Sequence, residues 1–318
     1  MDDAIIKNRN RGYTSSLSSD QVKEFRRRFS EKSICKSIGI SAFYLVSIYC
    51  SIYCFYILKE IDLNQSIIIL LAATSSLFIS RQMRALENIV HFGSHYNFSK
   101  SKHINDRATN VIAAWPMLSD VDTYRSYHMS HHGRYGGDTD PCKRRFERMK
   151  VKNGDFSSRW KFLRATIRWF PGYVVEYYKD IGSRRVQLFV FAFWHVIFGG
   201  VLALLVDIKF AIFSVAAWFF CMFCILPFVR LVAEVGEHDY ERESALFDTT
   251  FNNIGPMDLL LFHPAGDAWH VLHHLYPAVP WWKQRQAHKF LILHDDSYRN
   301  ALQRRAITGV VSGAVLSR

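Results

Sequence analysis

Long apolar segments alternate with polar, basic segments along this chain. The first covers residues 38–58, about the twenty residues that a helix needs to cross a bilayer. A second covers residues 63–80, and two more cover residues 187–206 and 211–229. Only four residues separate the members of each pair, so each pair predicts a tight helical hairpin. The pattern therefore predicts an all-α integral membrane protein with four transmembrane helices.

Basic residues are concentrated on one side of these predicted spans. Two hairpins place residues 1–36, residues 81–186 and everything after Arg230 on the same side. Nearly all lysines and arginines lie there, whereas the opposite turns offer only Lys59 and Lys209. The positive-inside rule makes that side cytoplasmic. We expect a cytoplasmic helical cap on the membrane helices.

Composition narrows the class of partner. Lysine and arginine number 40 against 28 aspartates and glutamates, a net charge of +12. The basic residues are scattered among aromatic ones without a nucleic-acid motif, so an anionic membrane surface is the better partner and no nucleic acid is expected. The six cysteines form no disulfide framework. We expect a basic N-terminal tail over residues 1–36 and one membrane domain over residues 37–318.

Two further segments have intermediate polarity. Residues 160–178 mix arginine and lysine with tryptophan, phenylalanine and tyrosine, which is typical of a helix lying in the headgroup layer; a soluble amphipathic helix is the alternative. Residues 111–118 are apolar but too short to span, and we expect them beside the site in the interface.

Histidines gather in three short boxes that carry eight of the fourteen in the chain. On a helix, residues three and four apart share a face, so each box directs its imidazoles into one small volume. Eight imidazoles exceed what one tetrahedral zinc can bind, which predicts two metal ions in one cluster. Residue types alone admit zinc, copper, iron or nickel. The boxes are His91 and His95; His128, His131 and His132; and His270, His273 and His274.

These boxes, their order and spacing, and the spans between the second and third box resemble the membrane fatty acid desaturase and hydroxylase family, in its bacterial form. The resemblance covers residues 38 to 290, and no catalytic residue is expected outside the metal site. Short motifs around the boxes also resemble those of this family: Tyr124-Arg125, Asp140-Pro141, Glu237-His238 and His274-Leu275-Tyr276-Pro277.

The resemblance implies two iron ions, with O2 as co-substrate for attack on an unactivated C–H bond. It adds His238 as a ninth metal ligand beside the eight box histidines. Similar proteins carry asparagine where Glu234 stands, so either Glu234 or Glu237 is expected close to one metal. Glu87 and Asp267, close in sequence to His91 and His270, are placed to accept imidazole N–H bonds. Asp140 completes the set of carboxylates expected around the ligands.

Desaturation of a fatty acyl chain or lipid-like substrate from the bilayer is the predicted reaction, with hydroxylation of an alkyl chain or specialised metabolite as the alternative. A membrane zinc hydrolase would need only three or four of these histidines. A metal transporter would place its ligands within the spans. The expected location is a bacterial inner membrane, with the site cytoplasmic.

Electrons are expected from a separate protein, a ferredoxin or a b-type cytochrome with a reductase, because the chain has no cytochrome, iron–sulfur or dinucleotide motif. Lys143, Arg144 and Arg145 form the predicted docking patch for an acidic carrier.

Five histidines remain outside the predicted metal site. His195 lies within the third span, where one hydrogen bond to a neighbouring helix is the expected role. His263 is expected in a turn before the third box. The last three, His103, His288 and His294, are expected to be solvated.

Overall fold

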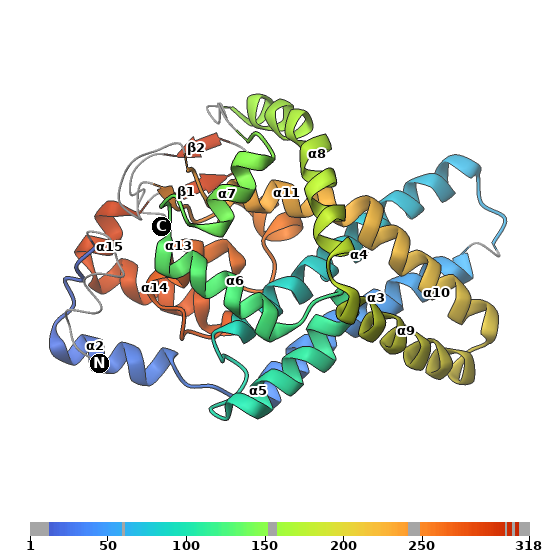
Figure 1. The fold of residues 1–318 in the computed structure, drawn as a ribbon, viewed down its shortest axis with the longest axis horizontal. Coiled ribbons are helices and arrows are strands. Elements are labelled where there is room, and N and C mark those ends of the chain that lie inside the picture. The colour runs from blue at the N-terminus through green and yellow to red at the C-terminus, as the bar shows by residue number, and fades with distance from the viewer. Residues whose placement is uncertain are drawn as a thin grey trace.

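The protein is almost entirely helical, as a computed structural model of the chain shows (Figure 1). The structure describes residues 13–58, 61–151, 158–240 and 249–302 and two short strands beyond them. The predicted all-α fold class is confirmed, apart from the small antiparallel pair β1 (Arg304–Ala306) and β2 (Gly309–Val311). The α-helices are α2 (Ser19–Phe29), α3 (Ile34–Leu58), α4 (Gln65–Ser94), α5 (Lys102–Thr109), α6 (Val121–Arg134), α7 (Pro141–Arg148), α8 (Arg159–Gly182), α9 (Arg185–Leu205), α10 (Ile208–Phe220), α11 (Leu226–Glu237), α13 (His270–Leu275), α14 (Gln284–His294) and α15 (Asp296–Ala301).

Shorter helical turns join several of these helices. Three have π-helical and three have 3₁₀ hydrogen bonding. Those with π geometry are η1 (Asn110–Ala114), η3 (Cys221–Ile225) and η4 (Asp258–Phe262), and those with 3₁₀ geometry are η2 (Trp115–Met117), η5 (Asp267–Trp269) and η6 (Trp281–Lys283). The apolar residues 111–118 thus form two successive turns, and their residues Ala113 and Ala114 are buried in the core.

Among the described residues, four helical segments are long and apolar enough to cross a membrane, as predicted: α3, α4, α9 and the continuous stretch Ile208–Glu237. In Figure 1, α3, α9, α10 and the first half of α4 run side by side at one end of the molecule. Large apolar side chains on their outer faces are exposed, among them Leu70, Phe189 and Leu204. Lipid would cover these side chains, because a helix that is apolar all round belongs in a core or a bilayer.

Helix α4 continues beyond its membrane-spanning half and carries Glu87 and His91, with His95 at its C-cap. Its 30 residues give a length of about 45 Å at 1.5 Å per residue, well beyond a hydrocarbon core. From Ile79 to Ser94 nearly every side chain is buried. This second half is the central helix of the cap and carries the first histidine box into it.

The fourth span changes geometry at η3, because Pro227 follows it. Proline has no N–H, so the carbonyl of Phe223 loses its helical partner. Hydroxyl groups from other helices bond to carbonyls of this turn: Tyr178 to Phe223 at 2.9 Å, Tyr177 to Met222 at 3.3 Å, and Ser80 to Cys221 at 3.3 Å. The turn therefore ties the fourth span to α8 and α4.

Helix α8 runs crosswise to the spans (Figure 1). One side of it packs inward through Trp169, Tyr173 and Tyr177, while Trp160 and Ile167 are exposed. This two-sided helix has the form predicted for residues 160–178. Its position in the headgroup layer remains a prediction.

The N-terminal segment packs on the cap rather than extending from it. Phe25 and Phe29 of α2 contact Phe290 of α14. Ahead of α2, the hydroxyls of Tyr13 and Ser15 donate to the buried carboxylate of Asp295, the latter at 2.6 Å. Residues almost 300 positions apart in sequence are joined at this carboxylate.

We expect Asp295→Ala to lower the free energy of unfolding by about 2–3 kcal/mol, because hydrogen bonds to a charged group are strong. Burial opposes ionisation of Asp295, but the hydroxyls of Ser15 and Tyr13 keep its pKa below the ordinary value. Its contribution is therefore complete above about pH 3.9 and is lost as the pH falls through the lower pKa of the folded state. Limited proteolysis near residues 13–18, compared with the exposed control Asp296→Ala, measures this effect.

Candidate metal centre

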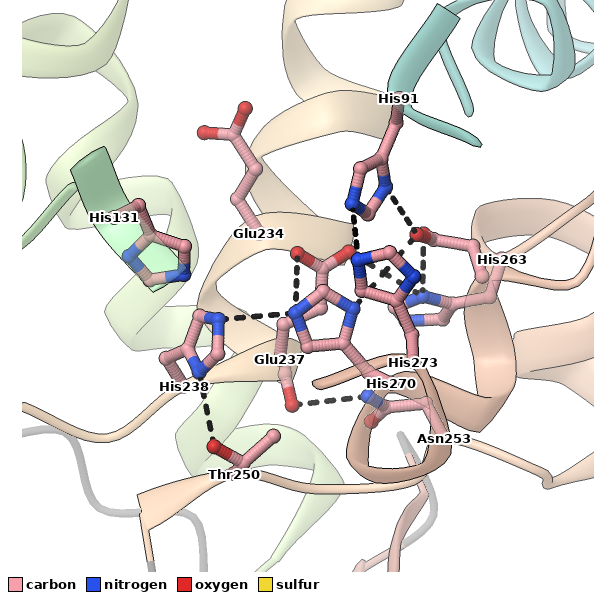
Figure 2. A network of polar contacts seen from close by, with 12 residues as sticks. His91, His131, Glu234, Glu237, His238, Thr250, Asn253, His263, His270 and His273 are labelled. Atoms are coloured by element: carbon pink, nitrogen blue, oxygen red, sulfur yellow. Dashed lines mark hydrogen bonds and ion pairs between the residues drawn. The ribbon is translucent and has the colours of Figure 1, made fainter. Parts of the chain in front are cut away.

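Four elements bring the nine predicted ligand histidines together in the cap. The end of α4 supplies His91, with His95 at its C-cap, and α6 supplies the second box. The third box is the six-residue helix α13. His238 follows the end of α11, where the backbone turns extended and bridges to Thr250. Figure 2 shows His91, His131, His238, His270 and His273 directed toward one another.

Five histidines form what we call the first histidine group. The Nε2 atom of His273 lies 2.7 Å from that of His91, 3.2 Å from that of His132 and 3.4 Å from that of His128. His128 Nε2 is in turn 2.9 Å from His132 Nε2 and 3.0 Å from His95 Nε2. The members of this group are His91, His95, His128, His132 and His273.

This spacing fits ligands of one metal ion. Two nitrogens about 2.1 Å from the same ion lie about 3.0–3.4 Å apart when the angle between them is about 90–110°. Neutral imidazoles with one N–H each have too few protons to satisfy five converging Nε2 atoms by hydrogen bonding among themselves. A cation at their centre satisfies all of them.

The remaining four histidines form the second histidine group. His238 Nε2 and His270 Nε2 are 2.9 Å apart. The rings of His131 and His274 lie 5.1 Å and 5.0 Å from that of His238 between centroids. The buried Nε2 of His274 has no hydrogen-bond partner among the described residues, as expected of an atom that binds a metal. The rings of His132 and His274 stack at 4.3 Å and join the two groups.

Polar side chains orient two rings of the second group through contacts with their Nδ1 atoms. His131 Nδ1 donates to Asp140 at 2.9 Å, which leaves Nε2 for a metal. Nδ1 of His238 lies 3.0 Å from the hydroxyl of Tyr135 and 3.3 Å from that of Thr250. Partners of this kind fix the ring orientation and raise the basicity of the free nitrogen.

We expect Asp140→Asn to weaken metal binding at the second group by about 10–100-fold, because it removes the negative charge behind His131. Asp140 is buried and also accepts from the backbone of Gly136 and Cys142, so a local effect on folding is monitored by thermal unfolding. Competition with a chelator measures the affinity. The matched control is Asp138→Asn, a side chain that is 99% exposed.

The environment keeps most of these imidazoles neutral, which is the form that binds metals. Burial, reinforced by neighbouring rings, lowers the pKa of His128 and His273 well below the ordinary value. Burial also lowers the pKa of His95 and His270 to about 3. At His131 burial opposes the charge, but Cys142 and Asp140 raise the pKa to about 10. That position favours a positive charge, which a metal ion would supply.

The five predicted carboxylates take different positions. Asp140 lies behind His131 as described. Asp267 lies 3.9 Å from His91 Nδ1 and 4.0 Å from His270 Nδ1, beyond hydrogen-bond length. Glu237 lies 3.8 Å from His270 Nε2. Glu234 and Glu87 instead pair with arginines, and Figure 2 shows Glu237, rather than Glu234, among the imidazoles.

Three further histidines have contacts that the sequence did not predict. His263 is buried, with Nδ1 3.2 Å from Asp267, so it belongs to the polar network of the site. The sequence feature that could have indicated this contact is that His263 lies four residues before Asp267. His288 is also buried and lies 2.9 Å from the Tyr298 hydroxyl, so the expectation that it is solvated is wrong. His103 and His294 are exposed, as expected. His195 bonds within its own helix, to the carbonyl of Phe191 at 2.9 Å, rather than to a neighbouring one.

Only part of the predicted docking patch is exposed. Arg144 is exposed, but Arg145 turns inward, with its guanidinium 3.2 Å from Glu234 and over the ring of Tyr173. Lys143 reaches back to the carbonyl of Gly136 at 3.2 Å. These three residues therefore do not form one exposed basic patch.

A cavity of about 620 Å³ opens onto both histidine groups. His91 and His128 line it from the first group, and His131, His238 and His270 line it from the second. A molecule bound there would face both metal positions.

Fold and site together define an integral membrane protein whose histidine boxes meet in a helical cap beyond one end of four spans. A family model described as fatty acid desaturase matches residues 65–304, about three quarters of the chain. The chain belongs to the fatty acid desaturase family and is an oxidoreductase of the membrane desaturase and hydroxylase type. A comparison with curated proteins finds none that matches.

Proposed function

We propose that this protein is an O2-dependent di-iron oxidoreductase that desaturates a fatty acyl chain or a similar lipid-like substrate. The observation that supports this most directly is that five histidines gather their ligand atoms in one place and three more, His131, His238 and His274, gather theirs in another, with His270 2.9 Å from His238. Membership of the desaturase family favours iron over the other metals that imidazole binds.

When bound, two irons would supply the reduction of O2 and the oxidation of a C–H bond. The chain itself binds them through the nine histidines, and Asp140, Tyr135 and Thr250 hold two of the rings in place. Desaturation removes two hydrogens from the substrate, consumes O2, two electrons and two protons, and releases two waters. Hydroxylation inserts one oxygen atom and releases one water, so both reactions need the same external electrons.

Substrate, electron donor and location complete the proposal. The substrate would come from the bilayer, because Ser183 and Gln187, where α8 meets the third span, are among the residues that line the cavity. A separate ferredoxin, or a b-type cytochrome with a reductase, would supply the electrons. The distribution of lysine and arginine supports a cytoplasmic site, in a bacterial inner membrane. Residues 37–318 would form the membrane domain, with residues 1–36 as an N-terminal segment.

The test is the metal content and Mössbauer spectrum of detergent-purified protein expressed with both iron and zinc available. We expect about two irons per chain, antiferromagnetically coupled when oxidised. One zinc and no iron would refute the proposal and favour a zinc hydrolase. Lipid analysis of expressing cells then distinguishes desaturated from hydroxylated products.

A further inference from the structure

We propose that the cavity binds the polar head of an amphiphilic substrate, so that the oxidised carbon lies close to the head group and not in the middle of the chain. The head would carry a hydroxyl or amine, that is, a hydrogen-bond donor. This inference rests on the proposed function, because it concerns the substrate of the same site.

A chain of alternating charges forms one wall of the cavity. Arg145 lies 3.2 Å from Glu234, which accepts from Arg230 at 2.8 Å. Arg230 lies 3.4 Å from Glu87, which is 3.5 Å from Arg84. Each of these side chains is less than 20% exposed, and all five line the cavity.

The charged groups of this wall oppose burial of an alkyl chain against them. Of the lining residues, only Val90, Met117 and Phe146 are aliphatic, thioether or plain aromatic; most of the others are charged or can form hydrogen bonds. A hydrocarbon in the cavity would displace water from the charged groups without replacing its hydrogen bonds, which is unfavourable. A polar head that makes hydrogen bonds avoids this cost.

Several polar atoms on the wall have unused hydrogen-bonding capacity among the described residues. The hydroxyl of Tyr240 and the Oε2 atom of Glu234 are both buried and make no hydrogen bond with any residue that the structure describes. Glu234 Oε2 has only the ion-pair contact with Arg145. A carboxylate oxygen accepts and a phenol both accepts and donates. Together they match a hydroxyl or an ammonium group.

The part of the cavity beside the third span has the same character. Asp180 and Ser183 are exposed lining residues at the end of α8, and Gln187 lies two residues into the third span. If α9 crosses the membrane, this part of the cavity lies at headgroup level. A polar head could move from the headgroup layer into the cavity without crossing an apolar barrier, while its tail stays in lipid beside α9.

Binding to the metal-free protein in nanodiscs tests this without relying on turnover. The probes are N-dodecylethanolamine, which carries an amine and a hydroxyl, and 1-methoxydodecane, which has no donor. We expect the amine probe to bind at least tenfold more tightly. Tyr240→Phe should reduce that preference about tenfold with little effect on folding, because the lost hydroxyl bonds to none of the described residues. Glu234→Gln should reduce it further.

The matched control is Glu147→Gln, an exposed glutamate on α7 that does not line the cavity. It should leave binding unchanged. Equal binding of both probes, or insensitivity to both cavity variants, would overturn the proposal. So would an affinity change in the control as large as that in Tyr240→Phe.

Product position provides the second test. Tandem mass spectrometry of lipids from cells expressing the iron-loaded enzyme should place the new double bond or hydroxyl within about three carbons of the head group. Mid-chain oxidation by a protein that holds two irons would overturn this inference and leave the proposed function intact. Absence of iron would instead refute the proposed function.

Discussion

His273→Ala is expected to abolish metal binding at the first histidine group and, with it, all oxidation of substrate. His273 Nε2 lies within 3.4 Å of the Nε2 atoms of three other histidines, so its loss removes the nitrogen on which the group converges. Because the metal positions are held by shared helices, we also expect the second group to bind its metal more weakly. Iron per chain should fall from about two to one or fewer.

A matched control separates this effect from the loss of a histidine in general. His103 is exposed at the start of α5 and contacts no histidine of either group. His103→Ala should retain both irons and full activity. Retention of two tightly bound irons in His273→Ala would contradict the arrangement that we propose for the centre.

The membrane helices could be predicted because hydropathy alone determines them. An apolar run of about twenty residues must form a helix in lipid, whichever contacts it makes. The predicted spans begin within four residues of the helices, as at Ile34, where α3 begins four residues before the predicted span, whereas α4 and the stretch Ile208–Glu237 continue well beyond the predicted ends. Polar residues such as Lys36 near a helix end cost little, because they reach the interface.

The choice between Glu234 and Glu237 could not be made from sequence. The two lie three residues apart on the last turn of α11. Glu237 lies close to His270, whereas Glu234 lies between Arg145 and Arg230. That difference depends on α7 and α13, which are far from both residues in sequence.

The burial of isolated polar residues could not be predicted from the sequence either. His288 lies among polar neighbours in sequence, but α15 brings Tyr298 against it. Tyr13 and Asp295 are likewise paired only by the packing of the N-terminal segment on the cap. Sequence periodicity predicts the apolar face of a helix but not which distant side chain will satisfy a buried polar group.

Arg84→Met is expected to destabilise the fold by about 3–5 kcal/mol, the usual cost of removing one partner of a buried ion pair. Arg84 Nη2 donates to Glu237 at 3.0 Å and to Asp267 at 3.1 Å, and all three side chains are at least nine-tenths buried. Burial opposes ionisation of Asp267, yet Arg84 and His263 hold its pKa well below the ordinary value. Without the guanidinium, Asp267 remains buried without its main counter-charge, next to Glu237, whose pKa burial and Asp267 raise well above the ordinary value.

Thermal unfolding of the metal-free protein measures this cost, because bound metal would itself stabilise the folded state. The control is Arg107→Met, which removes an exposed arginine on α5 and should change stability by less than about 0.5 kcal/mol. Arg84→Lys keeps the charge but not the fork of donors, so it should recover only part of the loss. A loss in Arg84→Met no larger than that in Arg107→Met would mean that the carboxylates do not depend on Arg84.

A double variant separates the charge effect from the lost packing. In Arg84→Met with Asp267→Asn, the second change removes one of the carboxylates that the first leaves uncompensated. Because the two side chains are in direct contact, we expect the combined destabilisation to be smaller than the sum of the two single effects. The double variant should nevertheless bind less iron than the unchanged protein, since Asp267 also lies beside His91 and His270. A combined destabilisation smaller than the sum would mean that Arg84 stabilises the site by neutralising the carboxylates behind its histidines. A combined destabilisation equal to the sum of the two single effects would exclude that role.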